Sequence, residues 1–233
     1  MRRNQFLVIA LACSLIGACN RDHGNQAANA PNPDTGAVGT AGNADKNKPG
    51  FGDKDFVQDV AKANTAEIEL GRMASERAAD PEVKKFGQMM VDDHTQAGDK
   101  LKAIATDTGI EWPAELDGKF KDQRDDLAKK QAGDFDHDYM TAMVNAHQDL
   151  VDKLESRIDK KNLTEWKADK KNREPGKTVQ EGAKTVEIVP EKSDNPVTTR
   201  INEWAATVYP TAYAHLESAK TLDSAVKRRH TNP

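Results

Sequence analysis

Four stretches of the chain place apolar residues at alternating steps of three and four, which lines them up along one face of an α-helix. The stretches cover about residues 53–79, 81–107, 135–159 and 196–227. A helix with one apolar face needs other helices to cover that face, and four such helices share a single core when they pack together. The pattern therefore predicts an all-α domain over residues 53–233, built as a four-helix bundle.

Two dipeptides predict where helices begin. Asp80-Pro81 and Asn195-Pro196 each combine a side-chain oxygen that can accept from free backbone N–H groups with a proline that loses no hydrogen bond at the first helical position. Asp134 could cap the third long helix in the same way. The connection from Gly109 to Gly133 has room for a short helix over about 120–130. Its length suits the long crossover of a ferritin-like bundle.

Residues from about 160 to 195 interrupt the pattern before the last long helix. The segment is rich in Lys and Glu and contains Pro175-Gly176 and Glu181-Gly182. A small hairpin that pairs residues 178–179 with 185–189 is one expectation, although two strands alone are only marginally stable. The segment is predicted to be a polar insertion on the surface.

Each apolar face carries one ionisable residue near the middle of its helix. These residues are Glu67, His94, His147 and His215. The first three lie about 13 residues into their helices and the fourth slightly past the middle of its own, at about 1.5 Å of rise per residue. Positions in the middle of packed helices share one layer whichever way the neighbouring helices run. The four side chains are therefore expected to converge.

Two interpretations of this layer remain open. The four residues can hydrogen-bond one another and fix the register of the helices, as buried histidines often do. Alternatively, they can bind one transition-metal ion, because ligand bonds offset the cost of burying a carboxylate and three imidazoles. Such a ligand set suits Cu, Zn, Fe or Mn. A classical di-iron centre is not expected, because Val91, Val144 and Ala212 stand three residues before the histidines, where it needs glutamates.

Five further residues could contribute to such a site. Met90 and Met143 each precede a histidine by four residues on the same face; their sulfur would favour copper, although methionine is also a common core residue. Asp93, Tyr139 and Tyr213 could hydrogen-bond to the ligands. No motif for a catalytic triad, a phosphate-binding loop or covalent haem is present, so the pattern indicates no catalytic residues and leaves enzymatic activity undecided.

The start of the chain predicts export and a lipid anchor. Arg2-Arg3 precede a short apolar run, which is typical of a signal peptide over residues 1–18. Ile16-Gly17-Ala18-Cys19 resembles a bacterial lipobox, in which Cys19 becomes the lipidated N-terminus. Asn20 in place of Asp resembles lipoproteins held at the periplasmic face of the outer membrane in Gram-negative bacteria. Residues 19–52 contain almost no large apolar side chains and are predicted to be a disordered, flexible tether.

Charge and composition limit the classes of binding partner that are expected. The net charge is −4, without long runs of one sign, so no nucleic-acid partner is expected. The expected membrane contact is the lipid on Cys19, and no protein partner is indicated. After cleavage of the signal peptide Cys19 is the one cysteine left, so disulfides are not expected in the fold.

Several short motifs resemble a known family of exported bacterial proteins, the domain of unknown function 4142. They are Asn64-x-x-Glu67-Ile68-Glu69-Leu70-Gly71, Phe86 through His94, Phe135-Asp136 with Tyr139, His147-Gln148, and Tyr209-Pro210 followed by His215-Leu216. The resemblance covers about residues 53–227 apart from the insertion, and it implies a ferritin-like fold but no established activity. Family members usually have Leu where this chain has Tyr209, and its segment from 167 to 194 is longer than expected.

Two functional hypotheses follow. The first is an envelope-anchored lipoprotein that binds one transition-metal ion in its core, with a role in metal handling or in redox and stress protection. The second is a non-catalytic structural or interaction module in which the buried polar layer sets helix register.

Overall fold

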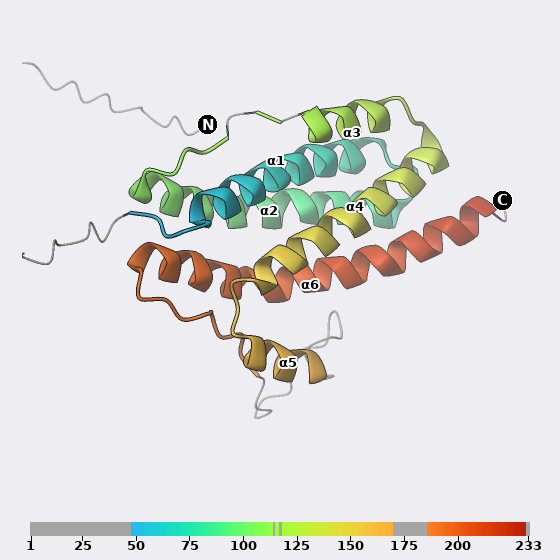
Figure 1. Cartoon of the computed structure of the whole chain (residues 1–233). Coiled ribbons are helices and arrows are strands. Elements are labelled where there is room, and N and C mark those ends of the chain that lie inside the picture. Colours follow the sequence, from blue (N-terminus) through green and yellow to red (C-terminus); the bar gives the residue numbers. More distant parts are fainter. Residues whose placement is uncertain (1–47, 114, 117, 170–185, 232–233) are drawn as a thin grey trace, which may run out of the picture. The chain divides into compact units, whose positions relative to one another are not determined.

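The computed structural model describes residues 48–113, 115–116, 118–169 and 186–231 (Figure 1). The predicted signal peptide, the lipidation site at Cys19 and most of the predicted tether lie outside these residues. Within them, no helix is both long enough and apolar enough to cross a lipid bilayer.

All regular secondary structure in the described residues is helical apart from one isolated bridge between Ile158 and Pro190. The helices are α1 (Asp53–Arg77), α2 (Pro81–Thr108), α3 (Gly118–Ala128), α4 (Ala132–Glu155), α5 (Lys160–Ala168) and α6 (Pro196–Thr231). The prediction of an all-α fold is confirmed, and its four long helices correspond to α1, α2, α4 and α6. The ferritin-like four-helix bundle stays a prediction.

The long helices pack in two main pairs. Helix α1 lies along α2, and α4 lies along α6; further contacts join α2 to α6 and α1 to α4, while α3 contacts α1 and α4 (Figure 1). Buried apolar side chains form two clusters, one around Phe56, Leu101, Leu154 and Ile201 and the other around Leu70, Phe86, Tyr139 and Ala219. Along each long helix the ionisable residue of the apolar face falls at the boundary between these clusters.

The two caps predicted directly before a proline are confirmed by hydrogen bonds. The side chain of Asp80 accepts from the backbone N–H of Glu82 at 2.7 Å, and that of Asn195 accepts from the N–H of Val197 at 2.8 Å. The prediction for Asp134 is wrong, because α4 starts at Ala132 and Asp134 lies in its first turn. The residue before the helix is Gln131, whose side chain makes no capping hydrogen bond.

The insertion is not wholly a surface feature. Its first part forms α5, which the polar composition did not predict, and Leu163 and Trp166 of this helix are buried in the core. The ring of Trp166 makes edge contacts with Tyr209 and Tyr213 of α6, each with centroids 5.3 Å apart. Leu163 and Trp166 are only three positions apart, and two apolar residues are too short a pattern to predict a helix. Of the expected hairpin, residues 178–179 and 185 lie outside the described residues, and 186–189 form no strand.

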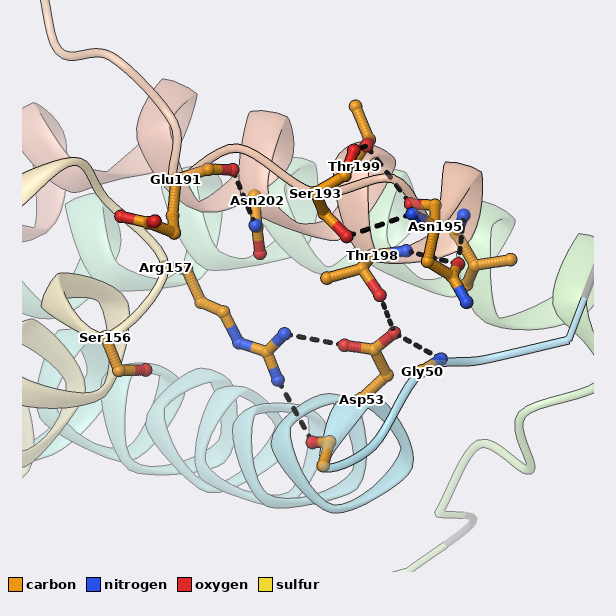
Figure 2. A network of polar contacts seen from close by, with 12 residues as sticks. Gly50, Asp53, Ser156, Arg157, Glu191, Ser193, Asn195, Thr198, Thr199 and Asn202 are labelled. Carbon is orange, nitrogen blue, oxygen red and sulfur yellow. Dashed lines mark hydrogen bonds and ion pairs between the residues drawn. The ribbon is translucent and has the colours of Figure 1, made fainter.

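A buried ion pair joins the start of α1 to the chain that follows α4 (Figure 2). The carboxylate of Asp53, fully buried, accepts from Arg157 at 2.6 Å, from the hydroxyl of Thr198 at 2.7 Å and from the backbone N–H of Gly50 at 2.8 Å. The guanidinium of Arg157 also lies over the ring of Phe56, 4.4 Å from its centroid. Because both carboxylate oxygens are used, the pair holds α1, α6 and the end of α4 together at one end of the domain.

Helices α1 and α2 cross with their backbones in close contact. A Cβ placed on Gly71 would lie 2.7 Å from the carbonyl oxygen of Gly87, and a Cβ on Gly87 would lie 2.7 Å from that of Gly71. Real side chains do not tolerate such distances to backbone atoms. Glycine at both positions therefore permits the approach that brings the central residues of the two helices together.

Substitution of Gly87 tests this crossing. Gly→Ala within an exposed helix usually stabilises it by about 0.5–1 kcal/mol. At Gly87 the added methyl must displace backbone of α1, so Gly87→Ala is expected to lower the free energy of unfolding by about 1–3 kcal/mol. Gly118→Ala is the control, because nothing lies within 4 Å of its Cβ position in α3. Equal stabilities of the two variants in chemical denaturation would contradict the close crossing.

Candidate metal centre

The four ionisable residues of the apolar faces meet in one layer of the core. Glu67 comes from α1, His94 from α2, His147 from α4 and His215 from α6, and these residues are between 0% and 6% exposed. The centroids of the three imidazole rings lie 5.4 to 5.8 Å apart. The predicted convergence is therefore present, and each long helix supplies one member.

His94 and His147 face each other through their Nε2 atoms. Nε2 of His94 lies 3.4 Å from Nε2 of His147. On the other side of His147, Nδ1 lies 3.0 Å from the carbonyl oxygen of Met143, one turn earlier in α4. A carbonyl oxygen can only accept, so the proton of His147 is on Nδ1 and its Nε2 carries a lone pair. That lone pair points at the ring of His94.

His215 is also oriented by an acceptor, but through Nε2 where His147 uses Nδ1. Nε2 of His215 lies 2.8 Å from a carboxylate oxygen of Asp93, so it carries the proton and donates it. Nδ1 of His215 is buried and has no hydrogen-bond partner among the described residues. His215 thus also presents a lone pair within the layer.

His94 has two acceptors on its Nδ1 side. Its Nδ1–H donates to the side-chain oxygen of Asn64 at 3.2 Å, while a carboxylate oxygen of Glu67 lies nearer, at 2.9 Å, but off the N–H direction. The other oxygen of Glu67 lies 3.8 Å from Nδ1 of His147. Neither oxygen makes a well-directed hydrogen bond to a described residue. The Glu67 carboxylate is therefore a buried negative charge whose neighbours are imidazole rings.

The pKa values indicate where positive charge is held. Burial would raise the pKa of Glu67, but His94 and His147 lower it to about 2, so the carboxylate is ionised. Burial opposes a charge on His94, yet the Glu67 carboxylate raises the pKa of His94 above its usual value. Burial lowers the pKa of His147 and, with the other two rings, lowers that of His215 to about 4. One positive charge on three imidazoles is the arrangement that the buried carboxylate favours.

A metal ion can supply that charge in place of a proton. One nitrogen from each of His94, His147 and His215 can be chosen so that all lie within 4.8 Å of one another. Two nitrogens bound at about 2.0–2.1 Å to one tetrahedral ion lie about 3.3 Å apart, close to the observed 3.4 Å between His94 and His147. Metal-bound histidines usually donate their other N–H to a carbonyl or carboxylate, as all three rings can here. The residues present fit a single cation.

Glu67 is placed differently from the three histidines. It was predicted as a fourth ligand, but its carboxylate contacts Nδ1 of His94, the nitrogen on the far side of the ring from His147. This is the position of a group that orients a ligand and balances its charge. The sequence pattern could not separate these roles, because both put a carboxylate in the same layer.

Two of the other predicted contributors adjoin the layer. Asp93 bonds to His215 from the edge of α2, with 44% of its side chain exposed. Tyr139 is fully buried, and its hydroxyl has no hydrogen-bond partner among the described residues. Burial and the charge of Glu67 raise the pKa of Tyr139, which keeps the phenol protonated.

The remaining three predicted residues have packing roles in this structure. Met90 and Met143 are fully buried in the apolar cluster around Phe86. Tyr213 lies in the aromatic contact with Trp166 of α5 rather than beside the histidines. Its position two residues before His215 puts it on another face of α6.

Asn64 contacts the layer, a role that the sequence analysis did not assign to it. It lies one turn before Glu67 and is 9% exposed, so its amide oxygen reaches Nδ1 of His94. A Cβ on Gly98 would lie 2.4 Å from the amide nitrogen of Asn64, so the glycine makes room for this side chain. The available signal was a polar residue within three positions of Glu67 on the same side of the helix.

A cavity of about 230 Å³ reaches the layer from one side. Glu67, His94 and His215 line it, together with residues of α1, α2, α4 and α6. The layer therefore borders a cavity, even though its side chains are almost completely buried.

Comparison with protein-family models gives a match over more than half of the chain. The family model described as Domain of unknown function (DUF4142) matches residues 38–175, which include Glu67, His94 and His147. Helix α6 and His215 lie beyond the matched range, although the resemblance noted in the sequence extends to residue 227. No curated protein and no solved structure matches the chain.

The acid sensitivity of the metal-free protein tests the site's electrostatics. A histidine with a lowered pKa stabilises the folded state above its unfolded pKa of about 6.5, and this contribution is lost as the pH falls. Because the pKa of His215 is about 4, acidification from pH 6.5 to 4 is expected to cost on the order of 3 kcal/mol of unfolding free energy at this residue. His215→Leu should flatten that part of the stability profile measured by urea denaturation. An unchanged slope in the variant would contradict the assignment.

Proposed function

The chain belongs to the Domain of unknown function (DUF4142) family, and from this premise we propose that it binds one transition-metal ion through His94, His147 and His215. The observation that carries the proposal is the orientation of the three rings. One nitrogen of each ring faces an acceptor: Asn64 or Glu67 for His94, the backbone carbonyl of Met143 for His147, and Asp93 for His215. The other nitrogen of each ring faces the layer. The membership itself implies no activity.

The charges in the layer support a divalent ion. Glu67 supplies one buried negative charge and Asp93 a second one at the edge, while the three rings are neutral when they act as ligands. A divalent cation would bring the sum to zero, which favours its transfer from water into the core. Without metal, a proton on His94 neutralises Glu67. Metal binding should therefore release this proton and weaken as the pH falls.

The ligand chemistry favours an ion that accepts imidazole nitrogen. Cu, Zn, Fe and Mn all do so, and three nitrogens with a carboxylate nearby do not choose among them. One ion is proposed rather than a di-iron pair, because a carboxylate-bridged pair needs glutamates where Val91, Val144 and Ala212 stand. Since three protein ligands leave a position open and a cavity adjoins the layer, metal handling with exchange, or redox protection, is the role that this geometry supports.

A structural role for the layer is the second candidate. Hydrogen bonds to Asn64, Met143 and Asp93 already satisfy one nitrogen of each ring, so the layer can set the register of four helices without metal. If this is its whole purpose, apolar residues of similar volume should preserve function and could raise stability. The buried charge of Glu67, with no well-directed hydrogen bond, argues for the metal.

The place of action that we propose is the bacterial envelope. Support comes from the sequence alone: a signal peptide over residues 1–18, Cys19 in a lipobox and a polar tether to residue 52. Lipid on Cys19 would hold the domain at the periplasmic face of the outer membrane. Metal ions and small oxidants that enter the periplasm would then reach it.

Metal content of the purified chain tests the proposed site. The full-length chain, purified in detergent without a histidine tag and then reconstituted, is expected to bind about one equivalent of a divalent transition metal by elemental analysis. His94→Ala or His147→Ala should lower the affinity by about 10-fold or more. His137→Ala is the matched control, because His137 pairs with Asp138 near the start of α4, outside the layer.

The register hypothesis makes the opposite forecast for the same samples. Less than about a tenth of an equivalent of any transition metal, in protein that circular dichroism shows to be folded, would refute the metal site. Measured proton release gives an independent check. Metal binding at neutral pH should release protons from the wild type, and fewer from Glu67→Gln, where His94 loses its stabilising charge.

A lipid anchor predicts a specific effect of substitution at Cys19. Expressed in a Gram-negative host, the wild-type chain should incorporate labelled palmitate and fractionate with the outer membrane, since acyl chains add about 0.8 kcal/mol of membrane affinity per buried CH₂. Cys19→Ser should abolish the label, whereas Cys13→Ser, within the predicted signal, should retain it. Equal labelling of the two variants would contradict the anchor.

A further inference from the structure

The cavity beside the layer has a base that is polar and incompletely bonded. Both oxygens of Glu67 and Nδ1 of His215 are buried without well-directed hydrogen bonds to described residues, and both residues line the cavity. His94 lines it as well, whereas His147 does not. An ion held by the three histidines would therefore be reached from the cavity on the side of His94 and His215.

One part of the cavity wall is apolar. Val60 of α1, Ala97 of α2 and Trp204, Val208 and Ala212 of α6 contribute to it. The indole N–H of Trp204 donates to the carbonyl oxygen of Ala97 at 3.1 Å, which ties α6 to α2 beside the cavity. The indole ring is thus held in place as a flat wall, which suits a flat or apolar ligand better than a strongly hydrated one.

The charge near the base disfavours an anion. With a divalent ion bound, Glu67 and Asp93 already bring the local charge to zero. An added anion would be a third negative charge in a poorly hydrated place, whereas a neutral donor atom adds none. Lys100 also lines the cavity, but it is exposed, so solvent screens its charge.

We propose that this cavity binds a small uncharged molecule with one nitrogen or oxygen donor atom and an apolar body, and that the donor atom coordinates the metal ion. The inference rests on the proposed metal site and adds a ligand class to it. The volume of about 230 Å³ and the wall of Trp204 fit a single small ring. Imidazole is such a ring and serves as the probe, and azide serves as the anionic comparison.

The experiment uses full-length chain loaded with Co²⁺, whose visible absorption reports coordination. The cobalt content is measured first, and imidazole or azide is then titrated. Imidazole is expected to change the spectrum saturably, with one equivalent bound, and to bind at least about tenfold more tightly than azide. Cobalt content after removal of free ligand must be unchanged, which shows that imidazole joins the ion rather than extracting it.

Two exposed threonines of α6 provide a matched pair of variants. Thr211 lines the cavity, and Thr221 lies on the same helix away from it. Thr211→Trp should obstruct the mouth and lower imidazole affinity at least about tenfold while cobalt content stays at the wild-type level. Thr221→Trp should behave as the wild type in both measurements.

Each outcome separates the two proposals. If cobalt binds but imidazole leaves its spectrum unchanged, or if Thr211→Trp binds imidazole as the wild type does, the cavity ligand is refuted and the metal site stands. If azide binds as tightly as imidazole, the preference for an uncharged ligand is wrong. If no cobalt binds to folded protein, the metal site and the cavity ligand both fail.

Discussion

The carboxylate of Glu67 requires a positive charge inside the core, and much of the structure follows from that requirement. Its nearest polar neighbours are the rings of His94 and His147, because the described core places no Lys or Arg beside it. One proton or one metal ion among the three imidazoles balances the charge of Glu67, whereas three protonated rings would repel one another. The acceptors Met143 and Asp93 then determine which nitrogen of each neighbouring ring faces inward.

The apolar core on either side of the layer offsets the free-energy cost of burying these polar groups. Two apolar clusters lie on either side of the layer along the helices, so the desolvated groups sit between large areas of buried hydrocarbon. The Gly71–Gly87 crossing brings α1 and α2 close enough for Glu67 to reach His94. At one end of the domain, the Asp53–Arg157 pair ties α1 to the chain that follows α4. Helix register and site geometry therefore depend on each other.

A layer that served register alone would gain nothing from a cavity beside it. Glu67 and His215 line this cavity, which takes the place of apolar packing between α2 and α6. This favours a site that exchanges ions or ligands over a purely structural layer. The family match reaches residue 175, so His215 and the cavity wall on α6 belong to the part of the chain beyond it.

The sequence by itself determined the four long helices, the caps at Asp80 and Asn195 and the four ionisable residues of the layer. The spacing of apolar side chains and the capping chemistry of Asp80 and Asn195 are local properties, so they can be recognised without knowledge of the fold. Only the tertiary structure decided what each polar residue contacts: Glu67 lies beside Nδ1 of His94, and Tyr213 packs against α5. These roles depend on which ring nitrogen meets which neighbour at about 3 Å, and residues far apart in the chain set that distance.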